Sequence, residues 1–198
     1  SDDTGIDLDN VSIISAPSTR LNTQIGAEPD PNFGVNGVVM LNDLLQSSGI
    51  ELGGLGIQPD GGIIVTGIVS GTEFNVGDDR VMMVAKLDLT GSLDPSFSFD
   101  GKQPVFGNAS RADVLDSAVL PDGSILVSGR SDFFTGDYAS YIAKLTADGS
   151  LDANFWIDGL VFDNLSAPSS GSFDGYDRIV VRDNNKLLLG TAGLGTHQ

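Results

Sequence analysis

Short apolar runs alternate with steps rich in Gly, Asp and Asn along most of the chain. In the middle of the sequence these runs are Val114–Leu120, Ser124–Arg130, Tyr138–Leu145 and Leu160–Asp163, and Lys102–Phe106 is an earlier equivalent of the last. Their length and content of β-branched residues predict β-strands. The second run is apolar at consecutive positions, which is typical of a strand buried on both faces. Only Leu41–Gln46 suggests a helical turn.

Three motifs recur with one period, which is the signature of a repeat protein. Pro59 and Pro121 of the first motif are 62 residues apart. The copies are Ile57–Gly67, Val119–Gly129 and Val181–Gly190 for the first motif, Asp30–Gly37, Asp94–Gly101 and Asp152–Gly159 for the second, and Val84–Leu87 and Ile142–Leu145 for the third. Independent motifs that keep one spacing indicate that the chain is built from copies of one structural unit.

Each unit contains four predicted strands, here called first to fourth in chain order. The first and second flank Pro-Asp-Gly, a tight turn in which Pro presets φ and Gly accepts positive φ. Four strands repeated about every 60 residues predict an all-β fold of β-propeller-type blades, each with four antiparallel strands, and about three blade equivalents in the chain. A β-solenoid and a pair of β-sandwiches are the alternatives.

The segment from Leu120 to Gly129, followed by Ala143–Phe155, resembles the bacterial delta-60 repeat, and Ala85–Phe97 is as close. The resemblance covers about residues 28–193. It implies a propeller-type fold in large exported bacterial proteins and implies no catalytic residues. The third copy departs from the pattern, because Asp183-Asn184-Asn185-Lys186 replaces the Pro-Asp-Gly turn.

The repeats divide the chain into an N-terminal segment, 1–27, three repeats at about 28–92, 93–150 and 151–193, and a tail, 194–198. The last repeat offers only first and second strands. Gly37–Leu41 fits a fourth strand and Val11–Ala16 a third, so the N-terminal half-blade would match the C-terminal one. Because unpaired sheet edges invite aggregation, we expect either a homodimer that closes a six-bladed ring or further blades of a longer chain.

The chain is strongly acidic, with a formal net charge of −17 and a pI of about 4.1. This charge repels phosphate backbones and anionic lipid surfaces, so nucleic acid is excluded as a partner. No run approaches the roughly 18 apolar residues of a membrane-spanning helix, so no membrane insertion is expected. Cysteine is absent, which excludes disulfides and thiolate sites. With the resemblance, these features favour an extracellular or cell-surface bacterial protein.

Acidic residues recur in the second motif and form the candidate metal site: Asp94, Asp100, Asp152 and Asp158. Ca²⁺ takes several loop oxygens as ligands, so Ca²⁺ is the one cofactor that the sequence suggests. The alternative is an Asx turn, in which the carboxylate accepts from nearby backbone N–H groups. We favour the Asx turn, since the spacing matches no EF-hand loop.

A ligand surface is expected in loops that differ between repeats, because loops carry most binding residues. Trp156, where other copies have Gly34 and Ser98, and the loop residues Glu73, Asp78 and Asp79 are the candidates. Phe33, Phe97 and Phe155 occupy one motif position and are expected to anchor packing. The resulting prediction is a non-enzymatic module that binds a protein or glycan. A glycan hydrolase using carboxylates and a self-assembling filament element are the alternatives.

Overall fold

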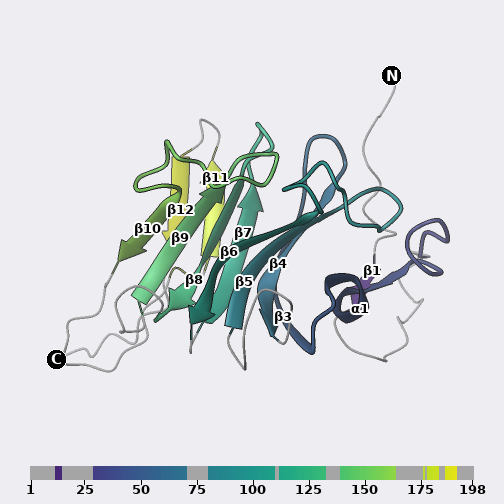
Figure 1. Ribbon diagram of the computed structural model, residues 1–198. Coiled ribbons are helices and arrows are strands. Elements are labelled where there is room, and N and C mark those ends of the chain that lie inside the picture. The colour runs from purple at the N-terminus through teal and green to yellow at the C-terminus, as the bar shows by residue number, and fades with distance from the viewer. Residues whose placement is uncertain are drawn as a thin grey trace, which may run out of the picture.

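The computed structural model describes residues 12–14, 29–70, 80–109, 112–132, 139–163, 176, 178–182 and 186–190 (Figure 1). These residues form two four-stranded antiparallel sheets, ordered β3-β4-β5-β6 and β10-β9-β8-β7, and two two-stranded sheets, β11-β12 and β1-β2. The all-β architecture with four-stranded antiparallel blades is confirmed. The first four-stranded sheet is called blade 1 and the second blade 2.

The strands lie close to the predicted runs. Blade 1 consists of β3 (Gly49–Ile57), β4 (Ile63–Ser70), β5 (Arg80–Leu87) and β6 (Lys102–Ala109). Blade 2 consists of β7 (Ala112–Val119), β8 (Ile125–Ser131), β9 (Ala139–Leu145) and β10 (Leu160–Asp163). The third sheet consists of β11 (Arg178–Arg182) and β12 (Lys186–Gly190) among the described residues. In each complete blade the fourth strand in sequence is the outer strand, farthest from the first in the sheet order.

The Pro-Asp-Gly turns form as predicted. The N–H of Gly61 donates to the carbonyl of Gln58 at 2.8 Å, and Gly123 donates to Leu120 at 2.9 Å. Both glycines have positive φ, 87° and 83°, a conformation that glycine adopts without steric cost. The third turn, 183–185, lies outside the described residues.

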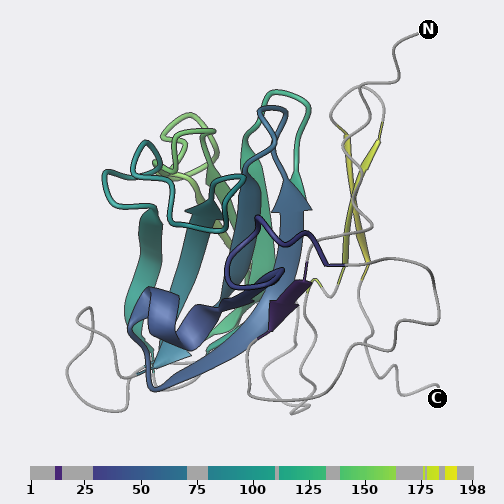
Figure 2. The ribbon, with the colours of Figure 1, turned by 90° about the vertical axis from the view of Figure 1, so that its right-hand side faces the viewer.

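The N-terminal elements differ from the expected half-blade. β1 (Ser12–Ile14) pairs with β2 (Val38–Met40) in parallel, with Ser12 opposite Val38. Neighbouring strands of both complete blades are antiparallel, so β1 and β2 do not pair as the third and fourth strands of a blade do, and the assignment of the N-terminal strand to a blade stays a prediction. The long connection between β1 and β2 lets the chain return in the same direction. The predicted helical turn is present as α1 (Leu41–Leu45), and it lies with β2 in front of blade 1 in Figure 2.

The core consists of three apolar layers between neighbouring sheets, because the central strands of each blade are buried on both faces. In β4, Ile64 and Ile68 face blade 2, while Ile63 and Val65 face α1 and β2. In β8, Val127 faces blade 1, and its neighbour Leu126 packs toward β11. Alternate residues of one strand thus serve two layers, which explains why these strands are apolar at consecutive positions.

Candidate functional site

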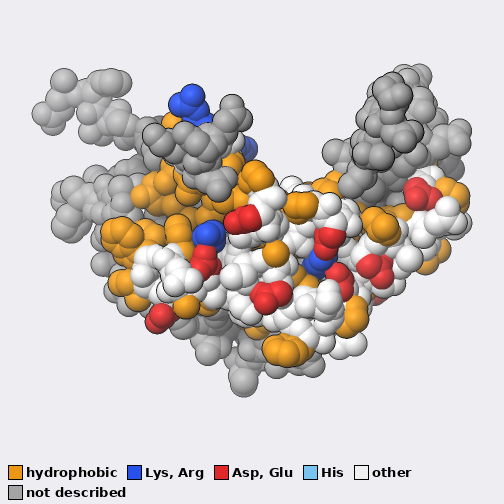
Figure 3. Space-filling view, turned by 90° about the horizontal axis from the view of Figure 1, so that it is seen from above, with side chains coloured by type: hydrophobic (Ala, Val, Ile, Leu, Met, Phe, Trp, Pro, Cys, Tyr) orange, Lys and Arg blue, Asp and Glu red, His pale blue; other side chains and the backbone are white. Residues whose placement is uncertain are grey.

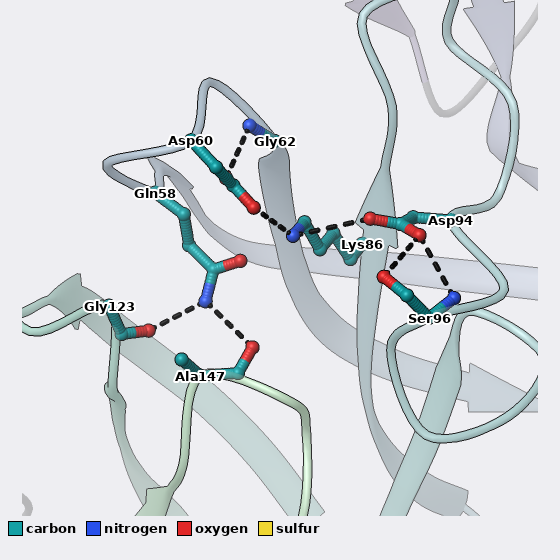
Figure 4. A network of polar contacts seen from close by, with 8 residues as sticks. All are labelled: Gln58, Asp60, Gly62, Lys86, Asp94, Ser96, Gly123 and Ala147. Carbon is teal, nitrogen blue, oxygen red and sulfur yellow. Dashed lines mark hydrogen bonds and ion pairs between the residues drawn. The ribbon is translucent and has the colours of Figure 1, made fainter.

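In each blade a lysine of the third strand pairs with an aspartate of the second motif. Lys86 of β5 extends to the turn before β4 and the loop before β6, where its Nζ lies 2.6 Å from Oδ2 of Asp60 and 3.2 Å from Oδ2 of Asp94 (Figure 4). The Lys86 side chain is only 7% exposed. In blade 2, Lys144 pairs with Asp152 at 2.7 Å. Lys86 therefore joins all three motifs of blade 1, whereas the printed ion pair of Lys144 joins two motifs of blade 2.

Charge pairing sets the protonation of these groups. Burial opposes the charged form of Lys86, but its hydrogen bonds with Asp60 and Asp94 outweigh burial and raise the lysine pKa. The hydrogen bond from Lys86 lowers the pKa of Asp60. The pKa of Asp94 is lowered first by the Ser96 hydroxyl, and that of Asp152 by Lys144. The carboxylates are thus held charged by the protein's own donors.

The four aspartates proposed for Ca²⁺ lie in the expected turns. Oδ1 of Asp94 accepts from the N–H of Ser96 at 2.9 Å, and Oδ1 of Asp152 accepts from that of Asn154 at 3.0 Å, which confirms the Asx turns. Asp100 accepts from the N–H of Lys102 at 3.0 Å. Asp158 follows in the same loop with φ of 49°. The described residues contain no group of three or more His, Cys, Asp or Glu arranged to hold a metal, and Ca²⁺ binding stays a prediction.

The phenylalanines of the second motif connect neighbouring sheets, as expected of packing anchors. Phe33 and Phe97 are 2% and 1% exposed. A Cβ on Gly149 of blade 2 would lie 2.8 Å from Cζ of Phe97, so only glycine admits the ring at this distance. Next to the ring, the N–H of Ser98 donates to the carbonyl of Asp148 at 2.8 Å. The loop of one sheet is thereby seated on a glycine turn of the next.

Two residues after each phenylalanine, the same loop exposes an apolar side chain. Val35, Phe99 and Ile157 occupy this position in the three copies and are 76%, 98% and 70% exposed. We call them the exposed row. The sequence reasoning missed it because three different apolar residues occupy the position. Aligning the three motif copies for apolar residues would have revealed it.

Apolar hollows of about 550 Å³ and about 450 Å³ lie beside the first and last members of the exposed row. Their linings are equivalent in the repeat. Val38 and Met40 line the first, and Leu160 and Phe162 line the second. Trp156, predicted to be a ligand contact, also lines the second hollow and is 75% exposed.

A second cluster joins the first strands of the two blades. Arg80 donates to Oε1 of Glu51 at 2.8 Å and to Oε2 at 2.6 Å, and lies 3.9 Å from Oδ1 of Asp113. The hydrogen bonds from Arg80 lower the pKa of Glu51. Glu51 was missed from sequence, although it lies one repeat period of 62 residues before Asp113. The predicted ligand residues Glu73, Asp78 and Asp79 lie outside the described residues.

Figure 3 shows the face that carries the turns and motif loops, where acidic side chains are dispersed among hydrophobic patches. Among the described residues, no helix is long and apolar enough to cross a membrane.

The comparisons agree with this architecture. The family described as "Domain of unknown function (DUF5122) beta-propeller" matches residues 58–97 and 120–155. Both segments run from a Pro-Asp-Gly turn to the phenylalanine of the following motif loop. The chain is a β-propeller-type repeat protein, and the match supports a repeat family of that type. No curated protein and no solved structure matches the chain.

Proposed function

We propose that the protein is a non-enzymatic binding or structural module that acts outside the cell, as part of a bacterial adhesin or surface assembly. The exposed row carries this proposal. Large apolar side chains at one position of successive repeats do nothing for the folded chain when they are 70% to 98% exposed. An apolar side chain that every copy of the loop exposes, with an apolar hollow beside two of the three copies, is the kind of surface that a partner covers.

The exposure of the row is not caused by a missing neighbour. Blade 1 is flanked by α1 and β2 on one face and by blade 2 on the other, yet Phe99 is 98% exposed. Val35 likewise stays 76% exposed although Phe33 of the same loop packs in the layer with blade 1. These loops project beyond the packed layers, where a partner can reach them.

The chemistry of the row favours a protein partner over a glycan. Sugar rings stack on aromatic faces, and only Phe99 provides one, whereas Val35 and Ile157 offer aliphatic contacts. The hollows beside the row have apolar linings that suit the side chains of a protein segment. The net charge of −17 favours partners with basic residues around an apolar centre.

The test compares the wild-type chain with a triple variant, Val35→Ser, Phe99→Ser and Ile157→Ser. The control is Leu89→Ser, because Leu89 is 68% exposed in a neighbouring turn but is not in the row. A random-peptide display library and a glycan array are the probes. We expect the wild type and the control to enrich apolar, basic peptides and the triple variant to lose at least tenfold in affinity for them. Equal peptide binding by the triple variant, with unchanged circular dichroism, would refute the proposal.

A hydrolase is the second candidate, because Glu51 and Asp113 converge on Arg80 from equivalent strands. A glycosidase acid needs a raised pKa, whereas the pKa of Glu51 is lowered. We therefore expect no turnover of chromogenic glycosides. Turnover that disappears in Glu51→Gln would establish the hydrolase and overturn the non-enzymatic assignment.

A further inference from the structure

The second hollow combines apolar surfaces with one acidic side chain. Its volume of about 450 Å³ lies within the range of roughly 300–1,000 Å³ that is common for ligand sites. The residues that line it are Leu151, Trp156, Ile157, Asp158, Leu160 and Phe162. Two of these side chains are aromatic, and Asp158 carries the one charge in the described lining. The hollow therefore offers a ligand aromatic rings and a carboxylate together.

The carboxylate of Asp158 is not used by its own loop. At the equivalent position of the preceding copy, Asp100 accepts from the N–H of Lys102 at 3.0 Å, and its Oδ2 lies 3.7 Å from Nζ of Lys102. In the third copy Leu160 replaces that lysine, and its N–H donates to the carbonyl of Ile157 at 3.0 Å. Among the described residues, no donor or cation pairs with the Asp158 side chain. An exposed carboxylate is thus left to the hollow.

Trp156 occupies a position where a large side chain contributes little to the fold. Its φ is 49°, a left-handed conformation that is unfavourable for a bulky residue. The other copies have Gly34 and Ser98 here, both with small side chains. Trp156 is 75% exposed, so burial does not offset this backbone strain. A contact between the indole and a ligand would account for the tryptophan.

An aromatic ring and a carboxylate are the two groups that a guanidinium ion pairs with. The flat cation stacks on an indole face, where the ring quadrupole attracts it. Its N–H groups donate in pairs to a carboxylate, a geometry that the ammonium group of lysine does not match. The aliphatic part of an arginine side chain needs apolar surface, which Ile157 and Leu160 supply.

We propose that the second hollow binds an arginine side chain of a protein segment whose neighbouring residues are apolar. This inference rests on the proposed function and adds the residue that the partner contributes. Charge complementarity supports it, since the chain has a net charge of −17 and the described lining holds a carboxylate and no cation. A neutral glycan fits less well, because its many hydroxyls would lack polar partners in a mostly apolar lining.

The first hollow provides a comparison within the same chain. One carboxylate, that of Asp43, lines it together with aliphatic side chains such as those of Val38 and Met40. No aromatic side chain is among the described residues of this lining. An arginine in the first hollow would meet a charge but no ring on which to stack. We therefore expect the second hollow to be the stronger arginine site.

The probe for this site is a short peptide, acetyl-Leu-Arg-Leu-amide, and its matched control carries citrulline in place of arginine. Citrulline keeps the shape of the side chain but has no charge. Trp156 is the single tryptophan of the chain, so its emission reports on binding at the second hollow. We expect the arginine peptide to change the emission with an affinity at least tenfold higher than that of the citrulline peptide. High salt should weaken the arginine peptide more than the citrulline peptide.

Two variants use residues that other copies of the loop already contain. Asp158→Asn introduces the residue type of Asn36, whose φ of 54° is close to the 49° of Asp158. Trp156→Ser introduces that of Ser98, whose φ is 47°. Both variants should fold like the wild type, which circular dichroism checks. Each should lose at least tenfold in affinity for the arginine peptide, measured by emission for Asp158→Asn and by calorimetry for Trp156→Ser.

Asp43→Asn is the control, because it removes the same charge from the first hollow and should leave the Trp156 response unchanged. Three results would each overturn the inference: no change in Trp156 emission with either peptide, equal affinities for the two peptides, or equal losses in Asp158→Asn and Asp43→Asn. A response to a neutral oligosaccharide without one to the arginine peptide would assign the hollow to a glycan and overturn it as well.

These outcomes are distinguishable from failure of the proposed function. If library peptides without arginine bind the wild type and lose affinity in the triple variant, the exposed row is a binding surface and only the arginine assignment fails. If the triple variant binds library peptides as the wild type does, the proposed function fails whatever the arginine peptide shows.

Discussion

A Cβ on Gly53 in the first strand of blade 1 would lie 2.2 Å from Cγ1 of Val114 in the first strand of blade 2. Gly53 also lies at a β-bulge, where the pairing of β3 with β4 shifts between Leu52 and Gly54. An equivalent bulge interrupts β7 between Val114 and Asp116. The two inner strands approach this closely because the first one lacks a side chain at the contact.

Gly53→Ala is therefore expected to destabilise the chain by about 1–3 kcal/mol, the usual cost of overpacking a close contact. Gly49→Ala is the matched control, since a Cβ at Gly49 of the same strand meets no atom within 4 Å. The control should stay within about 0.5 kcal/mol of wild type. Urea unfolding measures both, and equal stabilities for the two variants would contradict the close approach of the blades.

A second contact between the blades is polar. Nε2 of the buried Gln58 donates to the carbonyls of Gly123 at 2.6 Å and Ala147 at 3.1 Å (Figure 4). Gln58→Leu should cost about 1 kcal/mol, the net value of such hydrogen bonds. Gln58→Glu should cost more at neutral pH, because a carboxylate would face two carbonyl oxygens. If thermal denaturation ranks Gln58→Glu as the more stable variant, the assigned donor orientation is incorrect.

The lysine of blade 1 should matter more than that of blade 2. Lys86→Met leaves Asp60 and Asp94 without their shared cation, and Asp94 is only 20% exposed. We expect a loss of about 1–3 kcal/mol, since an acceptor that loses its buried donor incurs a desolvation cost. Lys144→Met removes one ion pair from a lysine that is 23% exposed, so its loss should be smaller. The urea midpoints of the two variants test this order of stability losses. A larger loss for Lys144→Met than for Lys86→Met would contradict the prediction.

Stability should depend on pH through the same groups. The pKa values of Asp60, Asp94 and Asp152 are lowered in the folded chain. Their contribution to the free energy of unfolding is complete above the pKa of about 3.9 that an aspartate has in the unfolded chain. It is lost as pH falls through their pKa values in the folded chain. The pKa of Lys86 is raised, so its contribution is complete below about pH 10.4 and is lost as pH rises through the folded value.

Urea unfolding measured from acid to alkaline pH should accordingly give a free energy of unfolding that is constant around neutral pH and falls at both acid and alkaline pH. In Lys86→Met the fall in stability at alkaline pH should lose the part that Lys86 causes. The fall at acid pH should be shallower than in the wild type, because Asp60 no longer has its main cationic partner. A loss of stability at acid pH as steep as that of the wild type would show that Lys86 does not lower the pKa of Asp60.

The period of the motifs was sufficient to predict the blades. Pro59 and Pro121 mark turns whose geometry depends on local residues alone, and consecutive apolar residues such as Ile125-Leu126-Val127 require burial on both faces. The Asx turns at Asp94 and Asp152 were predictable for the same reason, because a carboxylate and an N–H two residues later meet within one turn.

The sequence alone determined the repeat, the four-stranded blades, the turns and the charge, since these follow from local geometry and composition. Only the tertiary structure decided that Ser12–Ile14 pairs in parallel with Val38–Met40 and that Glu51, Arg80 and Asp113 meet across two blades. It also decided that Phe33 and Phe97 are seated on glycine turns while Phe155 is half-buried. These relationships join residues far apart in the chain, and no local propensity encodes which sheet lies beside a given loop.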